Sequence, residues 1–384
     1  MDKFDAIRPY TEAEALAAMP AFLHNPDFSK AVSLLSPKVT IADFEEELKQ
    51  VKSILDFQIM VPRRFIEYFV KISTKGVVFS GIEHLKRDET YLFIANHRDI
   101  VLDSAFLHQY FFSNGFNSAK IAIGDNLLYT PTLAQFAKMN KMFLVKRALS
   151  IREKLSNYQL LSEYIAHIIT TENESVWIAQ GNGRSKNGID QTQHGLVKML
   201  AMSERKQPLQ RLKTLKLTPV SISYEYEPCA RFKARETALS QHKNYTKLPD
   251  EDFNSIKEGL FGQKGHVHIA IGTPITNELD LIDPQLSVNE KIIEVCRLVD
   301  KQIYQNYKIF PTNYMAYDEL EQSHDFAEHY TPDEKTAFMD YLLQQTIVAD
   351  VSPDVMLKNL LHIYANPVKT CVLGENLIIP DCED

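Results

Sequence analysis

Histidine and aspartate occur together where an apolar run passes into a helical pattern. Residues 91–107 read YLFIANHRDIVLDSAFL, so the apolar run ends at Asn96 and His97 and the helical pattern begins near Asp103. Imidazole has an ordinary pKa of about 6.5, which lets it accept a proton at neutral pH. A neighbouring carboxylate can fix the tautomer of the ring and stabilise the imidazolium that forms. The pair suits deprotonation of an alcohol that attacks a thioester, and a helix cap beside a satisfied polar histidine would fit the same residues.

Basic residues follow two further apolar runs. Residues 142–147 read MFLVKR and end in Lys146 and Arg147, and residues 176–188 read VWIAQGNGRSKNG. A guanidinium offers a planar fork of donors that matches the oxygens of a phosphate, and glycine lets a backbone approach such a group closely. The two runs indicate a site for an anionic group, or a basic surface pair that opens a helix.

The charge of the chain is unevenly distributed. The 384 residues have a formal net charge of −8, yet Lys and Arg outnumber Asp and Glu by 14 to 6 over residues 131–216. An acidic chain is not suited to general nucleic-acid binding. The basic middle part indicates a local anionic ligand or an anionic surface, and a solvated helix face explains it equally well.

From about Gly76 onward, the elements that must position these residues follow an alternating α/β pattern. Short β-rich runs alternate with helical ones, which predicts an α/β fold with a mostly parallel central sheet flanked by helices. Ligands of such sheets bind at the carboxyl ends of the strands. The expected strands are 76–80, 91–95, 120–123, 142–146, 176–179, 218–223 and 266–271, and the expected helices between them are 104–112, 130–139, 151–170, 193–202 and 288–306.

Helical patterns without strands flank this region on both sides. The predicted division is an N-terminal helical segment at 1–75, a catalytic domain at 76–310 and a C-terminal helical cap at 311–384. Pro62 is expected to break a long run of the first segment into two helices. The cap is expected to contain helices at 332–349 and 353–363, followed by an extended tail after Pro367.

The sequence around His97 resembles the glycerophospholipid acyltransferase family, which includes glycerol-3-phosphate and lysophosphatidate acyltransferases. The hallmark of that family is a histidine and an aspartate separated by four residues. Here five residues separate His97 from Asp103, and Leu102 stands at the usual position of the acid. Asp103 is assigned because the run DSAFL matches the start of the family's helix, with Asp99 as the alternative. The resemblance implies that His97 is the catalytic base and that the acid orients it.

Three later blocks follow in the order of the family, so the resemblance covers about residues 77–275. It implies that Arg147, helped by Lys146, binds the phosphate of the acceptor. In the next block Asn182 stands where the family has a glutamate that holds the acceptor's polar head, and Gly183 and Arg184 match. The other implied substrate-binding residues are Asn96 and Arg98 beside His97, Lys186 beyond Arg184, and Pro219 in the last block, TPVSISYEYEP.

The implied activity is transfer of a fatty acyl group from acyl-CoA or acyl carrier protein (acyl-ACP) to a hydroxyl of a glycerophosphate or lysophospholipid acceptor. The resemblance implies neither a cofactor nor a metal. An asparagine at position 182 lacks the charge of glutamate, so another hydroxylated lipid, such as an acylated amino acid, is also an acceptor candidate. The alternative is a non-catalytic protein that binds or senses lipid on the same fold. The extra residue before Asp103 and the missing glutamate at position 182 motivate this alternative.

Other classes of site are disfavoured by their spacing. The run GNGRSK at 181–186 lacks the third glycine of a dinucleotide-binding loop. His266 and His268 fall on one face of a strand, but no third zinc ligand is nearby in the sequence. The Gly-x-Ser-x-Gly elbow of an α/β hydrolase is absent from the sequence.

The expected location is cytoplasmic, with peripheral attachment to the cytosolic face of a membrane. No run reaches the roughly 18–20 apolar residues that span a bilayer. The first ten residues do not read as a signal peptide. Four cysteines lie far apart, at Cys229, Cys296, Cys371 and Cys382, which suits reduced thiols.

Overall fold

Five helices precede the sheet in the computed structural model, which describes residues 3–35, 41–147, 149–241 and 251–375. They are α1 (Glu12–Leu23), α2 (Pro26–Leu35), α3 (Ile41–Leu48), α4 (Ile54–Met60) and α5 (Pro62–Ser73). The expected break at Pro62 is present. A second break separates α3 from α4, because the Ser53 hydroxyl accepts the N–H of Asp56 and caps α4.

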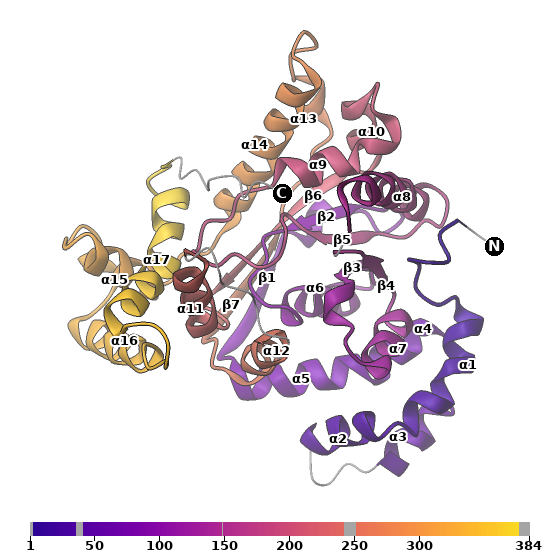
Figure 1. Ribbon diagram of the computed structural model, residues 1–384, viewed down its shortest axis with the longest axis horizontal. Helices are drawn as coiled ribbons and strands as arrows, with labels where there is room; N and C mark the ends of the chain where they lie inside the picture. Colours follow the sequence, from indigo (N-terminus) through magenta and orange to yellow (C-terminus); the bar gives the residue numbers. More distant parts are fainter. Residues whose placement is uncertain (1–2, 36–40, 148, 242–250, 376–384) are drawn as a thin grey trace.

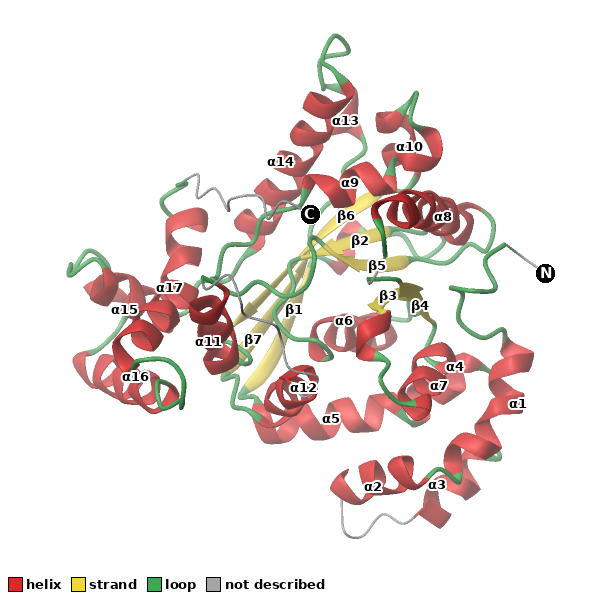
Figure 2. Cartoon of the chain, in the orientation of Figure 1, coloured by secondary structure: helices red, strands yellow, loops and turns green. Residues whose placement is uncertain are grey.

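A seven-stranded sheet lies at the centre of the chain (Figure 2). Its strands are β1 (Gly76–Ser80), β2 (Leu92–Ala95), β3 (Lys120–Gly124), β4 (Met142–Val145), β5 (Val176–Ala179), β6 (Leu217–Tyr224) and β7 (His266–Ile271), in the order β1-β7-β6-β2-β5-β3-β4. Strands β6, β2, β5, β3 and β4 are parallel, whereas β7 is antiparallel to β6 and parallel to β1. The predicted α/β fold with a mostly parallel sheet is confirmed.

Helices cover both faces of this sheet (Figure 1). One face buries Leu92 and Ile94 of β2 beneath α8 (Ile151–Thr170), α9 (His194–Leu200), α10 (Pro208–Thr214) and α14 (Val288–Asn306). The other face buries Phe93 and Ala95 beneath α5 and α6 (Leu102–Ser113). Successive strand residues point to opposite faces, and both sets are apolar, as a parallel strand covered on both sides requires. The polar residues that follow the strands are therefore the ones available for chemistry.

The N-terminal helices divide between two cores. Helices α1 to α4 pack with Met139 at the end of α7 (Pro131–Met139). Helix α5 joins the sheet instead, since its Ile66 and Phe69 belong to the core that contains Phe93. The first strand then begins at Gly76.

The C-terminal cap packs against α11 (Ala230–Ser240). It comprises α15 (Pro311–Leu320), α16 (Pro332–Gln345) and α17 (Pro353–Cys371). Its apolar core includes Ala230 and Ala234 of α11 together with Phe338, Leu360 and Tyr364 of the cap. Figure 1 shows the three cap helices gathered at one side of the sheet, next to α11.

The expected extended tail after Pro367 is wrong, because α17 continues to Cys371. A proline removes the N–H that would bond to the carbonyl four residues earlier. That carbonyl belongs to Ile363, and it lies so close to Gly188 that a Cβ on the glycine would be 2.2 Å from it. The loop after β5 therefore packs against the carbonyl that the proline frees, and burial of Val368 and Thr370 holds the last turn of the helix in place.

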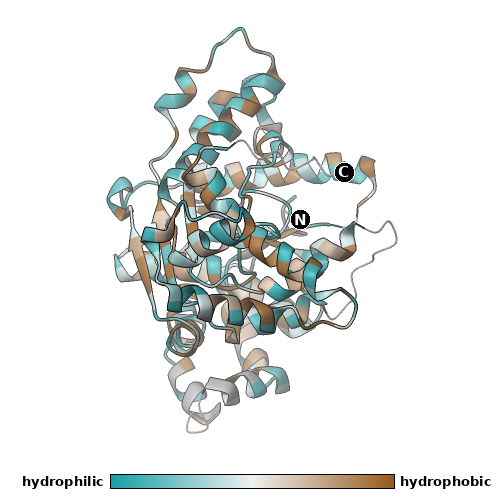
Figure 3. Cartoon of the chain, turned by 90° about the vertical axis from the view of Figure 1, so that its left-hand side faces the viewer, coloured by the Kyte–Doolittle hydropathy of each residue, from teal (hydrophilic) through white to brown (hydrophobic). Residues whose placement is uncertain are grey.

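Among the described residues, no helix combines the length and hydropathy that a bilayer crossing needs. Figure 3 shows hydrophilic and hydrophobic residues mixed along the helices of one side of the molecule. Cys229 and Cys296 are buried and Cys371 is half-buried, each as a free thiol. Cys382 lies outside the described residues.

Candidate active site

Polar residues directly follow the parallel strands, on the side of the sheet where the carboxyl ends of these strands lie. His97 follows β2, Arg147 follows β4, and Arg184 lies on the loop after β5. Parallel strands present their carboxyl ends on the same side, where α/β proteins bind ligands. Hydrogen bonds join these segments, among them one from the Ser185 N–H to the His97 carbonyl at 2.9 Å and one from Arg147 to Asn182.

The ring of His97 is held by Asp103. Its Nδ1 lies 2.8 Å from Asp103 Oδ2, across the loop between β2 and α6. Because an ionised carboxylate only accepts hydrogen bonds, the proton is assigned to Nδ1 and the lone pair to Nε2. The His97 side chain is 14% exposed, and the Trp177 ring meets it edge-on with centroids 5.7 Å apart. Within the described residues Nε2 has no protein partner, so it is the basic nitrogen available to a substrate.

Asp103 is fully buried and accepts three further hydrogen bonds. Its Oδ2 accepts the backbone N–H groups of Arg98 at 2.6 Å and Asp99 at 2.9 Å, and its Oδ1 accepts the Tyr224 hydroxyl at 2.7 Å. Burial alone raises the pKa of Asp103. The hydrogen bond and charge of His97, with the bonds from Asp99 and Tyr224, outweigh burial and hold that pKa below its usual value. Asp103 is therefore ionised at neutral pH.

Asp99, the alternative acid, has a different role. Its Oδ1 accepts the N–H groups of Val101 at 2.9 Å and Leu102 at 2.8 Å, which caps the first turn of α6. Of the two carboxylates that the sequence left open, Asp103 is the one bonded to His97.

Asn96 and Arg98, expected to contact substrate, are buried inside the protein. Asn96 donates to Asp190 at 2.8 Å and to the Ile222 carbonyl of β6 at 2.9 Å, and it accepts the Ile222 N–H at 2.7 Å. Arg98 pairs with Asp190 at 2.5 Å and with Glu227 at 3.2 Å. Both residues are 0% exposed. Their polar groups therefore fix the loop after β2 in place, and we do not assign them as direct ligands of a substrate.

The buried network continues into α11 and the C-terminal cap. Lys233 of α11 donates to the Arg98 carbonyl at 2.7 Å and forms an ion pair with Glu227. The Tyr364 hydroxyl of α17 accepts the backbone N–H of Glu227 at 2.9 Å. Removing one partner of a buried ion pair leaves an uncompensated charge. The cap is thus tied to the loop that carries His97.

Arg147 reaches across the end of β3. Its Nη1 donates to Asn182 Oδ1 on the loop after β5, and its backbone N–H donates to Asp125 Oδ1 at 3.1 Å. A Cβ on Gly124, the last residue of β3, would lie 3.2 Å from Arg147 Nε. The absence of a side chain there gives the guanidinium its path. Arg147 has no ion pair with any described residue, so its charge is free to meet an anionic ligand.

Arg184 also lacks a counter-ion in the described part of the chain. Its Nη1 is buried without a hydrogen-bond partner. Leaving such a donor unpaired costs roughly 1–3 kcal/mol, and more for a charged group. Its neighbour Ser185 is bonded to the His97 carbonyl. An anion bound at this loop would satisfy this donor.

The other expected binding residues differ in accessibility. Lys146 is exposed directly after β4, and Gly183 has a φ of 90° with open space around it. Lys186 forms an ion pair with Glu236 at 2.5 Å. Pro219 is buried within β6, where it lies opposite Ile94 and its carbonyl accepts a hydrogen bond at 2.8 Å. Pro219 therefore shapes the interior of the sheet and not the strand ends.

Three residues of the site were missed by sequence reasoning. Tyr224 ends β6 on the face that carries Val220 and Ile222, and strand alternation could have placed it there. Trp177 packs on the same face beside His97. Gln180 directly follows β5 with 5% exposure, and its Oε1 has no partner in the described chain.

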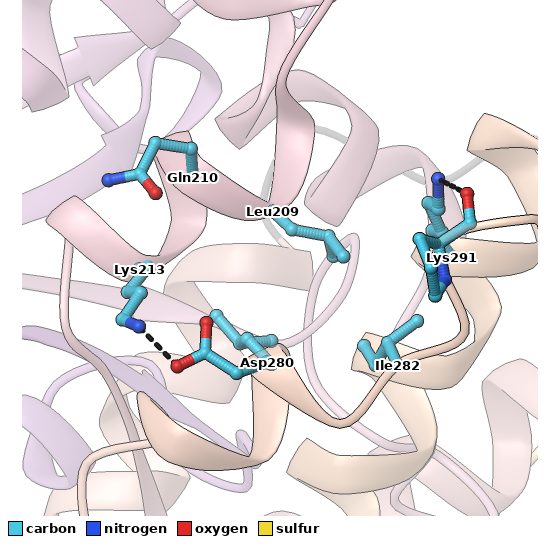
Figure 4. Close-up of a pocket in the computed structure, with 8 residues that line it drawn as sticks. Leu209, Gln210, Lys213, Asp280, Ile282 and Lys291 are labelled. Atoms are coloured by element: carbon cyan, nitrogen blue, oxygen red, sulfur yellow. Dashed lines mark hydrogen bonds and ion pairs between the residues drawn. The ribbon is translucent and has the colours of Figure 1, made fainter.

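A hollow of about 250 Å³ lies near the amino end of β6, away from the carboxyl ends of the parallel strands (Figure 4). Its wall includes Leu209 and Lys213 of α10, which precedes β6, and Asp280 and Lys291 beyond β7. Lys213 and Asp280 form an ion pair across it. Because α10 leads into the amino end of β6, this hollow is remote from the strand ends that carry His97.

The two histidines of β7 bond to residues from neighbouring strands, because Ser80 ends β1 and Glu225 directly follows β6. His266 Nδ1 lies 2.7 Å from Glu225 Oε2, and His268 Nε2 lies 3.1 Å from Ser80 Oγ. No group of three His, Cys, Asp or Glu side chains arranged to hold a metal occurs in the described ranges.

The comparisons with known proteins concern the segment that carries His97. The family described as Acyltransferase matches residues 76–223, which contain β1 to β5, all of β6 except Tyr224, and the candidate residues His97, Asp103, Arg147 and Arg184. Over residues 76–223 the chain is similar to the acyltransferase family. The expected resemblance to the acyltransferase family is therefore confirmed over these residues.

One solved structure similar to the chain is that of the 1-acyl-sn-glycerophosphate acyltransferase PlsC from Thermotoga maritima. The similarity has a TM-score of 0.37 and 11% sequence identity, and it covers 75% of this chain and 92% of that one. No curated protein sequence matches the chain.

Proposed function

We propose that the chain is an O-acyltransferase that moves a fatty acyl group from a thioester to a hydroxyl of a glycerophosphate or lysophospholipid. The observation that carries the proposal is the His97–Asp103 pair, joined at 2.8 Å, within a segment of the acyltransferase family. The pair leaves one ring nitrogen basic and accessible at the strand ends. This arrangement suits removal of a proton from a bound alcohol.

In the proposed reaction His97 Nε2 takes the proton of the acceptor hydroxyl as its oxygen attacks the thioester carbonyl. The carbon–sulfur bond then breaks, and the thiol leaves with the proton returned by the imidazolium. Asp103 holds the ring in the required tautomer and stabilises its positive charge while the proton is on it. No covalent acyl-enzyme is needed, because the bound alcohol is itself the nucleophile.

The acceptor is proposed to bind through its anionic head. Arg147 and Arg184 are both without counter-ions in the described chain, and they come from the loops after β4 and β5, of which the second bonds to the His97 carbonyl. Two guanidinium groups match the oxygens of a phosphate better than two ammonium groups would. This pairing supports a phosphorylated acceptor, with Asn182 held by Arg147 as a neutral hydrogen-bonding partner for the same head group.

Peripheral attachment to the cytosolic face of a membrane forms part of the proposal. Four large apolar side chains near these loops are about half or more exposed, at 48% for Tyr129, 88% for Ile151, 53% for Leu155 and 51% for Phe253. We name these four residues the apolar rim. Lys146 and Arg152 add positive charge beside it. Exposed apolar groups with basic neighbours suit an anionic lipid surface, from which a lipid acceptor would enter.

The test is transfer of a labelled acyl group from acyl-CoA or acyl-ACP to a panel of acceptors that includes glycerol 3-phosphate, lysophosphatidate and an acylated amino acid. We expect labelled ester with the parent chain and its loss in His97→Ala. His24→Ala, which changes an exposed histidine of the N-terminal segment, is the matched control. Binding of acceptor without ester from any donor would favour the alternative, a lipid-binding or lipid-sensing protein on an acyltransferase fold.

A further inference from the structure

A second hollow, of about 480 Å³, lies between the loop after β5, α11 and α17. Its volume falls within the range of roughly 300–1,000 Å³ that small-molecule sites occupy. The loop contributes Lys186 and Asn187, and α17 contributes Lys358, Asn359, His362 and Asn366. Figure 1 shows α11 beside α17. The C-terminal cap therefore builds one wall, and the loop that carries Arg184 builds the other.

The lining of this hollow is polar and positively charged. Lys186 and Lys358 are cationic, His362 can become so, and none of the described lining residues is acidic. Lys358 is exposed and has no ion pair within the described chain, whereas Lys186 is held at the edge by Glu236. Burial, with the positive charges of Lys369 and Lys358, lowers the pKa of His362. The hollow is thus suited to an anion and not to an acyl chain.

Short connections join this hollow to the candidate active site. Asn366 donates to the Asn187 carbonyl at 2.7 Å, and Gly188 lies against the Ile363 carbonyl. Ser185, next to Lys186 in the chain, donates to the His97 carbonyl. The segment 185–188 therefore contacts both α17 and the loop that carries His97, which makes it the route from the hollow toward that histidine.

We propose that the hollow binds the phosphate groups of coenzyme A and so holds the acyl donor. The inference rests on the proposed function, in which Arg147 and Arg184 already receive the anionic head of the acceptor. A second cationic site then belongs to the other substrate. Coenzyme A carries its phosphates on a small molecule that fits a concave site, and its long pantetheine arm can extend to the reacting carbonyl. An acidic carrier protein would instead need a broad open surface.

Binding measurements test this assignment without relying on turnover. Isothermal titration would compare free coenzyme A, 3′-dephospho-coenzyme A, pantetheine and glycerol 3-phosphate on the full chain. We expect Lys358→Glu to weaken coenzyme A binding about tenfold or more, since it replaces a charge-assisted contact with a repulsive one. Lys358→Ala should show a smaller loss of the same kind. Lys30→Glu, at an exposed position of α2, carries the same charge reversal away from the hollow.

Pantetheine binding should be unchanged by either substitution at Lys358, and His97→Ala should bind coenzyme A as the parent does. These two results separate the inference from the proposed reaction, because a chain without transferase activity can still show them. Equal coenzyme A affinity in Lys358→Glu and Lys30→Glu would refute the site. So would a parent chain that binds no coenzyme A and accepts acyl groups from acyl carrier protein alone. A loss of glycerol 3-phosphate binding in place of coenzyme A binding would assign the hollow to the acceptor and overturn the proposal.

Discussion

At the scale of single residues, one buried carboxylate controls the state of His97. Asp103 is bonded to Nδ1 of the ring and to two backbone N–H groups of the same loop. We expect Asp103→Asn to lower kcat about 10³-fold or more with little change in KM, because an amide N–H facing Nδ1 would favour the wrong tautomer. Steady-state kinetics provides the measurement. Asp99→Asn keeps the helix cap and is the matched control; a larger loss in that variant would return the role to Asp99.

Tyr224 is expected to help keep Asp103 ionised. Its hydroxyl donates to Asp103 Oδ1 and helps to lower the pKa of that carboxyl. In Tyr224→Phe the pKa of Asp103 rises, so the acidic limb of the kcat/KM profile should move to higher pH. Stability should also fall by about 1–3 kcal/mol, because a buried oxygen loses its partner. A profile that stays in place despite a lower stability would mean that Tyr224 has a structural role alone.

Arg147 is expected to act on acceptor binding. Because its guanidinium has no counter-ion in the described chain and reaches Asn182 over Gly124, Arg147→Ala should raise KM for a phosphorylated acceptor about 10- to 100-fold. KM for the acyl donor should change little. Arg152→Ala removes the same charge from an exposed position of α8. Equal effects of the two variants on KM would mean that Arg147 contributes only general positive surface charge and does not bind the acceptor directly.

At the scale of elements, the loop after β5 is fastened by a carboxyl group of α14. Asp300 Oδ1 accepts the N–H of Thr192 at 2.8 Å and its hydroxyl at 2.5 Å. Burial nevertheless outweighs these bonds and raises the pKa of Asp300 to about 7. Asp300 is therefore neutral in the folded chain at a pH where it is ionised in the unfolded chain.

The consequence is a pH-dependent stability. Since the folded chain binds the extra proton, the free energy of unfolding should fall as pH rises from about 4 to about 7, by up to about 1.4 kcal/mol per pH unit. Asp300→Asn keeps an acceptor oxygen without the charge. That variant should match the parent near pH 4 and exceed its stability at pH 8. Urea titrations at both pH values provide the measurement, and parallel pH dependence of the two chains would contradict the assignment.

The sequence predicts the elements better than their contacts. Alternation of short apolar runs with helical ones predicts all seven strands to within one residue at either end. Local signals also place His97, Arg147 and Arg184 at strand ends. A proline usually ends a helix, so the predicted α17 is too short; the burial of its last turn, which keeps the helix going past Pro367, depends on tertiary packing.

The partners of Arg98 and Asn96 could not be predicted in this way. Arg98 pairs with Asp190 and Glu227, which lie 92 and 129 residues further along the chain. Nothing in the spacing of the residues around His97 shows that these two side chains turn inward while His97 remains accessible. That distinction comes from tertiary packing, which decides whether a polar residue beside a catalytic one binds a ligand or supports the loop.

At the scale of the whole molecule, the apolar rim is expected to attach the protein to anionic bilayers. Full burial of an aliphatic side chain is worth roughly 1.5–3 kcal/mol, so the double variant Ile151→Glu with Leu155→Glu should reduce vesicle binding at least ~10-fold. Added salt should weaken binding of the parent, because residues 131–216 supply the positive charge. Co-sedimentation with vesicles of anionic and of neutral lipid provides the measurement.

The matched control for this surface is Ile347→Glu, at an isoleucine that is 77% exposed in the C-terminal cap. It introduces the same charge on an equally accessible apolar position outside the apolar rim. Binding that is indifferent to salt, or that falls as much in the control as in the double variant, would contradict attachment through the apolar rim.

The edge-on packing of Trp177 against His97 has an optical consequence. The chain contains a single tryptophan, and its indole is 4% exposed. All of the fluorescence that tryptophan gives to this protein therefore originates beside one imidazole. Tryptophan emission is therefore expected to respond to a charge placed on that ring, with no substrate, label or product assay required.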